Sequence, residues 1–213
     1  MTFQGWPAEA LEFYEHLEAD NSKSFWTDHK AVYEHTVREP MAALLDELEP
    51  EFGPAKIFRP NRDVRFSADK SPYKTHIGAH FDSGGYVQLS AEGLACGNGM
   101  YQLAPDQLDR YRTAVAGEVT GAELERVIAR VRKAGPEVVG RDALKTAPRG
   151  YAKDHPRIEL LRYKGLVAWQ EWEPAAWLGT REARKRITGF LRSSQPLRDW
   201  LDGQVGPSEL PPR

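Results

Sequence analysis

The hydrophobic pattern of this chain changes period near residue 57, and this change limits the folds open to it. From residue 77 to residue 81 apolar side chains alternate with polar or small ones, and a second alternating run covers residues 86–91. Gly84 and Gly85 lie between the two runs and are typical of a hairpin turn. Successive side chains of a strand point to opposite faces of a sheet. The pattern therefore predicts an antiparallel meander with one apolar face and one polar face.

Helical spacing is expected on both sides of this meander. Apolar residues recur every three or four positions through the first fifty residues, and Pro50, Gly53 and Pro54 are expected to stop the last of these helices. Further strands are predicted at residues 94–101 and 166–169, and further helices at residues 105–115, 122–133, 156–164 and 180–196. This order of helices, strands and helices predicts the α+β class.

We expect one globular domain over residues 1–202, with helices packed on an antiparallel sheet of about four or five strands. The 213 residues are enough for one sizeable core and few for two. Gly and Pro are frequent over residues 203–213, and this composition predicts a mobile C-terminal tail.

Composition argues against several classes of protein. The net charge is −2, so affinity for anions has to come from local patches. No apolar run approaches the ~20 residues that span a bilayer, and residues 1–7 lack the basic and apolar regions of a signal peptide. Cys96 is the single cysteine, so an internal disulfide is impossible. Together these features predict a cytoplasmic protein without a membrane partner.

Residues 58–74 combine cations, carboxylates, aromatic rings and prolines. A guanidinium offers a planar fork to an anion and an ammonium offers a point charge, while a tyrosine can stack on a ring attached to that anion. Phe66 is a second candidate for such stacking. The predicted ligand contacts in this segment are Arg62, Arg65, Lys70, Tyr73 and Lys74.

The same segment has a structural alternative. Arg62 can pair with Asp63 and Arg65 with Asp69, which would make a charge network that only holds a long loop. Five cations against two carboxylates favour a ligand, so both interpretations stay open.

A second basic stretch covers residues 145–164. Pro148 and Gly150 predict a fixed turn that can orient a neighbouring arginine. The predicted contacts here are Lys145, Arg149, Tyr151 and Lys164. If both stretches face one hollow, the local field is strongly positive, although a solvated basic surface is an equally good interpretation. We expect the two stretches to hold a small phosphorylated or carboxylated ligand.

These two stretches carry a resemblance to a known family. Residues 62–75, read as Arg-Asp-Val-Arg-Phe-Ser-x-Asp-Lys-x-Pro-Tyr-Lys-Thr, resemble the core signature of the bacterial and fungal family called domain of unknown function 2461. Residues 13–33, 97–105 and 144–164 are similar to its other conserved regions. The resemblance implies a compact single domain, and it carries over no catalytic residue and no cofactor.

Histidines are the candidates for proton transfer. His76 and His80 are predicted on the polar face of the sheet, and His155 lies in the second basic stretch. An ordinary half-solvated sheet face is the alternative for the first two. Two strand positions four residues apart are separated by about 13 Å, too far for two ligands of one ion, so no metal site is predicted.

A basic run in the last predicted helix supports a different function. Its cations are Arg181, Arg184, Lys185, Arg186 and Arg192, which can follow the phosphates of a nucleic acid or bind a partner protein. The simpler interpretation is the solvated face of an amphipathic helix.

Overall fold

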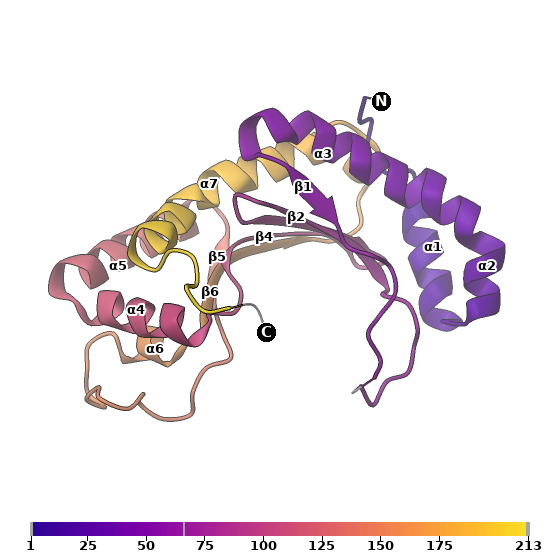
Figure 1. Cartoon of the computed structure of the whole chain (residues 1–213). Helices are drawn as coiled ribbons and strands as arrows, with labels where there is room; N and C mark the ends of the chain where they lie inside the picture. Colours follow the sequence, from indigo (N-terminus) through magenta and orange to yellow (C-terminus); the bar gives the residue numbers. More distant parts are fainter. Residues whose placement is uncertain (1, 66, 212–213) are drawn as a thin grey trace. The chain divides into compact units, whose positions relative to one another are not determined.

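The computed structural model describes residues 2–65 and 67–211, which fold into two compact units. Unit 1 comprises Met1–Cys96 and Glu171–Gly189, and unit 2 comprises Gly97–Gln170 and Phe190–Arg213. The α+β class is confirmed (Figure 1). Six strands form the sheet in the order β1-β2-β3-β4-β6-β5, rather than about four or five. The single-domain behaviour of residues 1–202 stays a prediction.

Unit 1 begins with helices that follow one another almost without a break. They are α1 (Ala8–Ala19), α2 (Lys23–Val32), a π-helical segment (Tyr33–Arg38) and α3 (Glu39–Phe52). Ser22 caps α2, because its Oγ accepts from the Phe25 amide at 3.1 Å. α3 continues past Pro50 to Phe52 and stops at Gly53, where φ is 79°, within the predicted stop at Pro50, Gly53 and Pro54.

The strands of unit 1 are those that the alternating pattern predicts, with one addition. They are β1 (Ala55–Ile57), β2 (His76–Phe81), β3 (Gly85–Ser90) and the first half of β4 (Gly93–Met100). β1 pairs with β2 and β2 with β3, both antiparallel. The three-residue β1 carries no readable alternation, which explains why the sequence did not predict it.

The core of unit 1 forms between the apolar face of this sheet and the first helices. Ile77, Ala79 and Phe81 of β2 are fully buried, as are Leu44 and Leu48 of α3. In Figure 1, α3 lies over β1 and β2. The alternate residues of β2 and β3 are only half-buried, apart from Gly78, so the predicted division into an apolar and a polar face is confirmed.

Unit 2 contains the other half of the sheet and its own helices. Its elements are the end of β4, α4 (Pro105–Ala116), α5 (Glu118–Lys133), β5 (Glu137–Arg141), α6 (Ile158–Arg162), β6 (Gly165–Trp172) up to Gln170, and α7 (Glu182–Gln204) from Phe190. β5 pairs antiparallel with β6. A Cβ at Gly99 would lie 2.4 Å from the Leu166 carbonyl oxygen, so only a glycine permits this close approach of the two backbones.

The prediction that α7 ends near Pro196 was wrong. The helix starts after Thr180, whose Oγ1 accepts from the Glu182 amide at 3.2 Å, and it continues to Gln204. Leu197 and Leu201 beyond the proline are fully buried. Packing of this apolar face therefore outweighs the lost backbone hydrogen bond.

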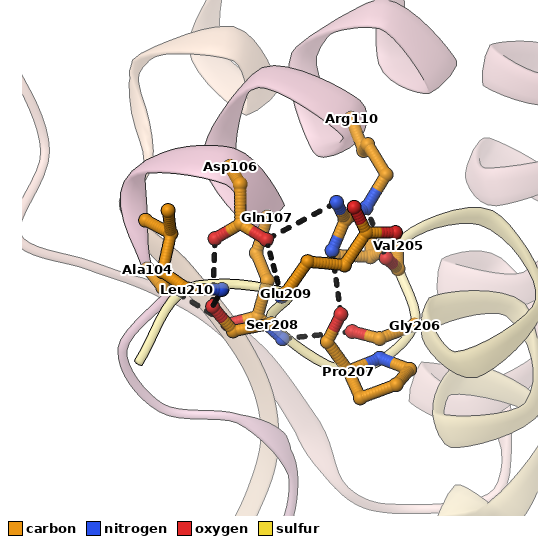
Figure 2. A network of polar contacts seen from close by, with 10 residues as sticks. All are labelled: Ala104, Asp106, Gln107, Arg110, Val205, Gly206, Pro207, Ser208, Glu209 and Leu210. Atoms are coloured by element: carbon orange, nitrogen blue, oxygen red, sulfur yellow. Dashed lines mark hydrogen bonds and ion pairs between the residues drawn. The ribbon is translucent and has the colours of Figure 1, made fainter. Parts of the chain in front are cut away.

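The segment after α7 is bound to the first turns of α4 (Figure 2). Its contacts are Arg110 Nε–Val205 O (2.6 Å), Arg110 Nη2–Pro207 O (2.6 Å), Gln107 Nε2–Gly206 O (2.7 Å), Ser208 Oγ–Asp106 Oδ1 (2.8 Å) and Glu209 N–Asp106 Oδ2 (2.8 Å). The Glu209 amide, with Ser208, lowers the pKa of Asp106 to about 2. The predicted mobility of residues 203–213 stays a prediction, and residues 212–213 lie outside the described part of the chain.

Among the described residues, no helix combines the length and the apolar character that crossing a bilayer requires.

Candidate functional site

A closed loop carries the first basic stretch in unit 1. Its two ends meet as a short antiparallel ladder, with a bridge between Asn61 and Tyr73. The Arg62 amide donates to the Pro72 carbonyl at 2.9 Å, and the Lys74 amide donates to the Pro60 carbonyl at 2.8 Å. These bonds fix the neck of the loop, which projects from β1 and β2 (Figure 1). The backbone on either side of the neck therefore has a defined position.

Asn21 binds this neck from the turn between α1 and α2. Its Nδ2 donates to the Tyr73 carbonyl at 3.0 Å, and its Oδ1 accepts from the Tyr73 amide at 3.1 Å. One side chain thus satisfies both backbone groups of Tyr73, as a neighbouring strand would. Asn21 was not among the site residues predicted from the sequence, because its partner Tyr73 lies 52 residues away in the chain.

The ring of Tyr73 packs inside unit 1. It stacks on Trp26 with a centroid distance of 4.3 Å and an interplanar angle of 11°. Trp26 in turn contacts Phe13 and Tyr33. One face of Tyr73 is therefore occupied by a protein ring, and its predicted contact with a ligand stays a prediction. Phe66, the second predicted stacking residue, lies outside the described residues.

Local carboxylates neutralise two of the predicted cations, but with partners exchanged relative to the expectation. Arg62 pairs with Asp69, and Arg65 pairs with Asp63 at 2.7 Å. The closed neck explains the exchange, because it brings Arg62 back toward the end of the loop. Lys70 donates to a backbone carbonyl, that of Val64, at 3.0 Å.

Both loop carboxylates are held in their charged form. The Arg62 guanidinium and then Ser71 depress the pKa of Asp69, and the side chain and backbone amide of Arg65 depress that of Asp63. Arg62 and Arg65 are therefore partly neutralised within the loop, and their predicted contacts with a ligand stay predictions.

A hollow of about 420 Å³ opens beside the neck, entirely within unit 1. It is lined by Glu18, Asn21, Arg62, Asp69, Ser71, Tyr73, Lys74, Thr75 and His76. Three predicted site residues, Arg62, Tyr73 and Lys74, thus come together with the predicted proton-transfer candidate His76. Arg65 and Lys70 do not line it.

Lys74 and His76 are the basic groups of this hollow that make no ion pair with any carboxylate of the described chain. Burial and then the charge of Arg59 lower the pKa of Lys74. Burial and then the charge of Lys74 lower the pKa of His76. The shifts of both groups come from desolvation and from neighbouring cations, so positive charge at the hollow is disfavoured in the free protein. An anion placed there would remove this cost.

The polar face of the sheet continues from this hollow. His80 contacts Phe58, with ring centroids 5.3 Å apart, and the hydroxyl of Tyr86 donates to Gln88 Oε1 at 2.8 Å. His80 is half-buried. Its proposed role in proton transfer stays a prediction.

The second basic stretch belongs to unit 2. Lys145, Arg149 and Lys164 are exposed, and among the residues that the structure describes none of the three makes an ion pair. Tyr151 is half-buried, and its amide donates to the Pro148 carbonyl at 3.2 Å in the predicted turn. Since the two stretches lie in different units, their convergence on one ligand stays a prediction.

His155 also lies in unit 2. Its Nδ1 accepts from the Arg157 amide at 3.0 Å, which leaves Nε2 as the protonated nitrogen of the neutral ring. A catalytic role for it stays a prediction.

The basic run at the start of α7 is partly neutralised. Arg184 and Arg181 both reach Glu47, at 2.9 and 3.3 Å, and Arg186 lies over the ring of Trp177. These contacts weaken the interpretation of the run as a phosphate-binding strip.

Two other chemistries find little support. Within residues 2–65 and 67–211, no group of three or more His, Cys, Asp or Glu side chains has the arrangement of a metal site. Cys96 is fully buried, and burial raises the pKa of its thiol. A buried neutral thiol is a poor nucleophile.

A comparison with models of known protein families identifies the family of this chain. The model of the conserved hypothetical protein family with domain of unknown function 2461 matches residues 9–200. The chain belongs to this family. The match includes both basic stretches, so the predicted resemblance is confirmed. No curated protein and no solved structure gives a significant match to the chain.

Proposed function

We propose that this member of the family binds a small phosphorylated or carboxylated molecule in the hollow of unit 1. Lys74 and His76 hold its anionic group, with Arg62 at the rim and Tyr73 in the wall. The unit 2 residues Lys145, Arg149, Tyr151 and Lys164 remain proposed contacts for the same class of ligand.

The observation that carries the proposal is the pair of uncompensated basic groups at Lys74 and His76. Buried or half-buried charges are normally paired, because an unpaired charge loses solvation without gaining a partner. Here the charges that shift the two pKa values are themselves positive: Arg59 acts on Lys74, and Lys74 acts on His76. A bound anion would supply the missing partner through charge-assisted hydrogen bonds.

Thermal unfolding with added anions tests the proposal. Inorganic phosphate, citrate and acetate are each titrated against the wild type and Lys74→Met, which removes the charge and keeps most of the side-chain volume. A ligand at 100 times its dissociation constant adds about 2.7 kcal/mol to the free energy of unfolding. We expect phosphate or citrate to stabilise the wild type and to have little effect on Lys74→Met.

The matched control is Lys30→Met, which removes an exposed charge of α2 outside the hollow. It should respond to anions as the wild type does. The proposal fails if no anion stabilises the wild type, or if both lysine variants respond equally.

A further inference from the structure

The polar face of the unit 1 sheet presents three ring side chains next to the proposed anion site. They are Phe58, His80 and Tyr86, which we call the ring platform. Phe58 lies 5.3 Å from His80 and 6.3 Å from Tyr86 between ring centroids, tilted by 37° and 40°. Phe58 is 38% exposed, an unusual exposure for a phenylalanine that the backbone holds in place. The Phe58 ring is therefore accessible to solvent.

Strand pairing places the platform on a single face. His80 lies opposite Lys56 on β1 and opposite Tyr86 on β3. The Phe58 amide donates to the Gly78 carbonyl at 2.8 Å, which fixes the backbone of Phe58 beside β2. Residues directly opposite each other in neighbouring strands share a face, so His80 of β2 and Tyr86 of β3 lie on one face. Phe58, the residue after β1, contacts both rings.

Gly78 allows Tyr86 to lie across the sheet. A Cβ at residue 78 would be 2.6 Å from the Tyr86 hydroxyl oxygen and 3.1 and 3.2 Å from two of its ring carbons. The ring thus covers the glycine, and the hydrogen bond to Gln88 fixes its hydroxyl. This arrangement keeps Tyr86 in one orientation without a ligand, which lowers the entropy cost of stacking another ring on the platform.

The platform is joined directly to the proposed anion site. The Lys74 ammonium lies 5.1 Å from the centroid of the Phe58 ring, and Lys74 also lines the hollow. Arg59 is the residue next to Phe58, and its charge acts on Lys74. The cations next to the platform suit a ligand that carries negative charge beside a flat ring.

From this arrangement we infer that the ligand is a mononucleotide-like molecule: one aromatic ring stacks on the platform and one phosphate binds at Lys74 and His76. The inference rests on the proposed function and adds the ring to it. Aromatic side chains stack on any base, so the platform selects the presence of a ring rather than a particular base. Sheet faces that present aromatic side chains recognise nucleotides by the same physics.

Isothermal titration calorimetry with three probes tests the inference: adenosine 5′-monophosphate, phenyl phosphate and inorganic phosphate. Stacking of one base contributes about 1–3 kcal/mol, which corresponds to roughly 5- to 150-fold in affinity. We expect the nucleotide to bind at least tenfold more tightly than inorganic phosphate, with phenyl phosphate between them. Equal affinities for all three would overturn the inference and leave the anion site standing.

Two variants locate the ring. Phe58→Leu keeps an apolar side chain and removes the aromatic face. Gly78→Ala pushes the Tyr86 ring off β2, because only the far end of a side chain has to move. Each should lower the ratio of nucleotide affinity to phosphate affinity by about fivefold or more. An unchanged ratio in both variants would refute the platform.

Two further results separate the possible failures. If none of the three probes binds, the proposed function fails together with the inference. If affinity for oligonucleotides rises steeply with their length, the surface binds a polymer and the commitment to a mononucleotide is wrong. A melting temperature close to that of the wild type shows that each variant is folded, so a lost ratio reports on binding.

Discussion

Asn21 holds the neck of the loop, and the substitution Asn21→Ala tests this role. Asn21→Ala removes two hydrogen bonds, one to the amide and one to the carbonyl of Tyr73. Each is worth about 1 kcal/mol net, and Tyr73 is buried, so water replaces them poorly. We expect the substitution to cost about 2 kcal/mol in the stability of unit 1.

Amide hydrogen exchange measures this effect where it arises. A loss of about 2 kcal/mol corresponds to roughly 30-fold faster exchange of the Tyr73 amide, if local opening controls exchange. Asn21→Asp is the matched control: its Oδ1 still accepts from the Tyr73 amide, but nothing donates to the carbonyl. It should show an intermediate effect on exchange.

The same substitution links the neck to the site. Lys74 follows Tyr73 directly and His76 lies two residues further on, so a released neck should also weaken anion binding, while the fold of unit 2 is unaffected. Unchanged exchange at Tyr73 in Asn21→Ala, or a loss of less than about 0.5 kcal/mol, would show that the two hydrogen bonds do not fix the neck.

Three further substitutions have definite expected outcomes. Folding lowers the pKa of His76, so the unfolded chain binds more protons than the folded chain. The free energy of unfolding should therefore rise with pH through the window at and just below pH 6.5. In urea unfolding, His76→Gln should flatten this rise. The pKa of Asp106 is lowered to about 2, so its stabilising effect is present above pH 4 and is lost between pH 4 and about pH 2. At pH 7, Asp106→Asn should make residues 205–211 more sensitive to limited proteolysis, because the bond to the Glu209 amide is weakened. An unchanged cleavage pattern would contradict this. Ser194→Ala removes the Oγ to which the side-chain amide of the buried Asn98 donates at 3.0 Å. It should lower the free energy of unfolding by about 1–3 kcal/mol in a urea titration. Ser193→Ala should lower it less, because the Ser193 hydroxyl donates to Phe190 of the same helix.

Much of the fold can be predicted from the sequence, because its strongest signal is local. Alternation over residues 77–81 and 86–91 corresponds closely to β2 and β3. β5 at Glu137–Arg141 was missed, since it has only two consecutive apolar residues and a glycine. The last helix was predicted to break near Pro196, but burial of Leu197 and Leu201 beyond the proline keeps it intact.

The candidate site was predictable in part. Part of the segment 58–74 lines a hollow, with Arg62, Tyr73 and Lys74 among the lining residues, but the sequence could not show which cations are already paired. The partner of Arg62 depends on the closure of the neck, which in turn depends on Asn21, 52 residues before Tyr73. No local pattern contains such a contact. The ring platform combines His80 of β2, Tyr86 of β3 and Phe58 after β1, and it became visible only with the register of these strands.

The most direct test of the central claim is the pKa of the His76 ring, followed by nuclear magnetic resonance with and without saturating inorganic phosphate. The account predicts a pKa below about 6.5 in the free protein, lowered by burial and by Lys74. Phosphate should raise it, because a bound anion favours the charged ring. A His76 pKa that does not move while phosphate binds would place the anion elsewhere and contradict the account.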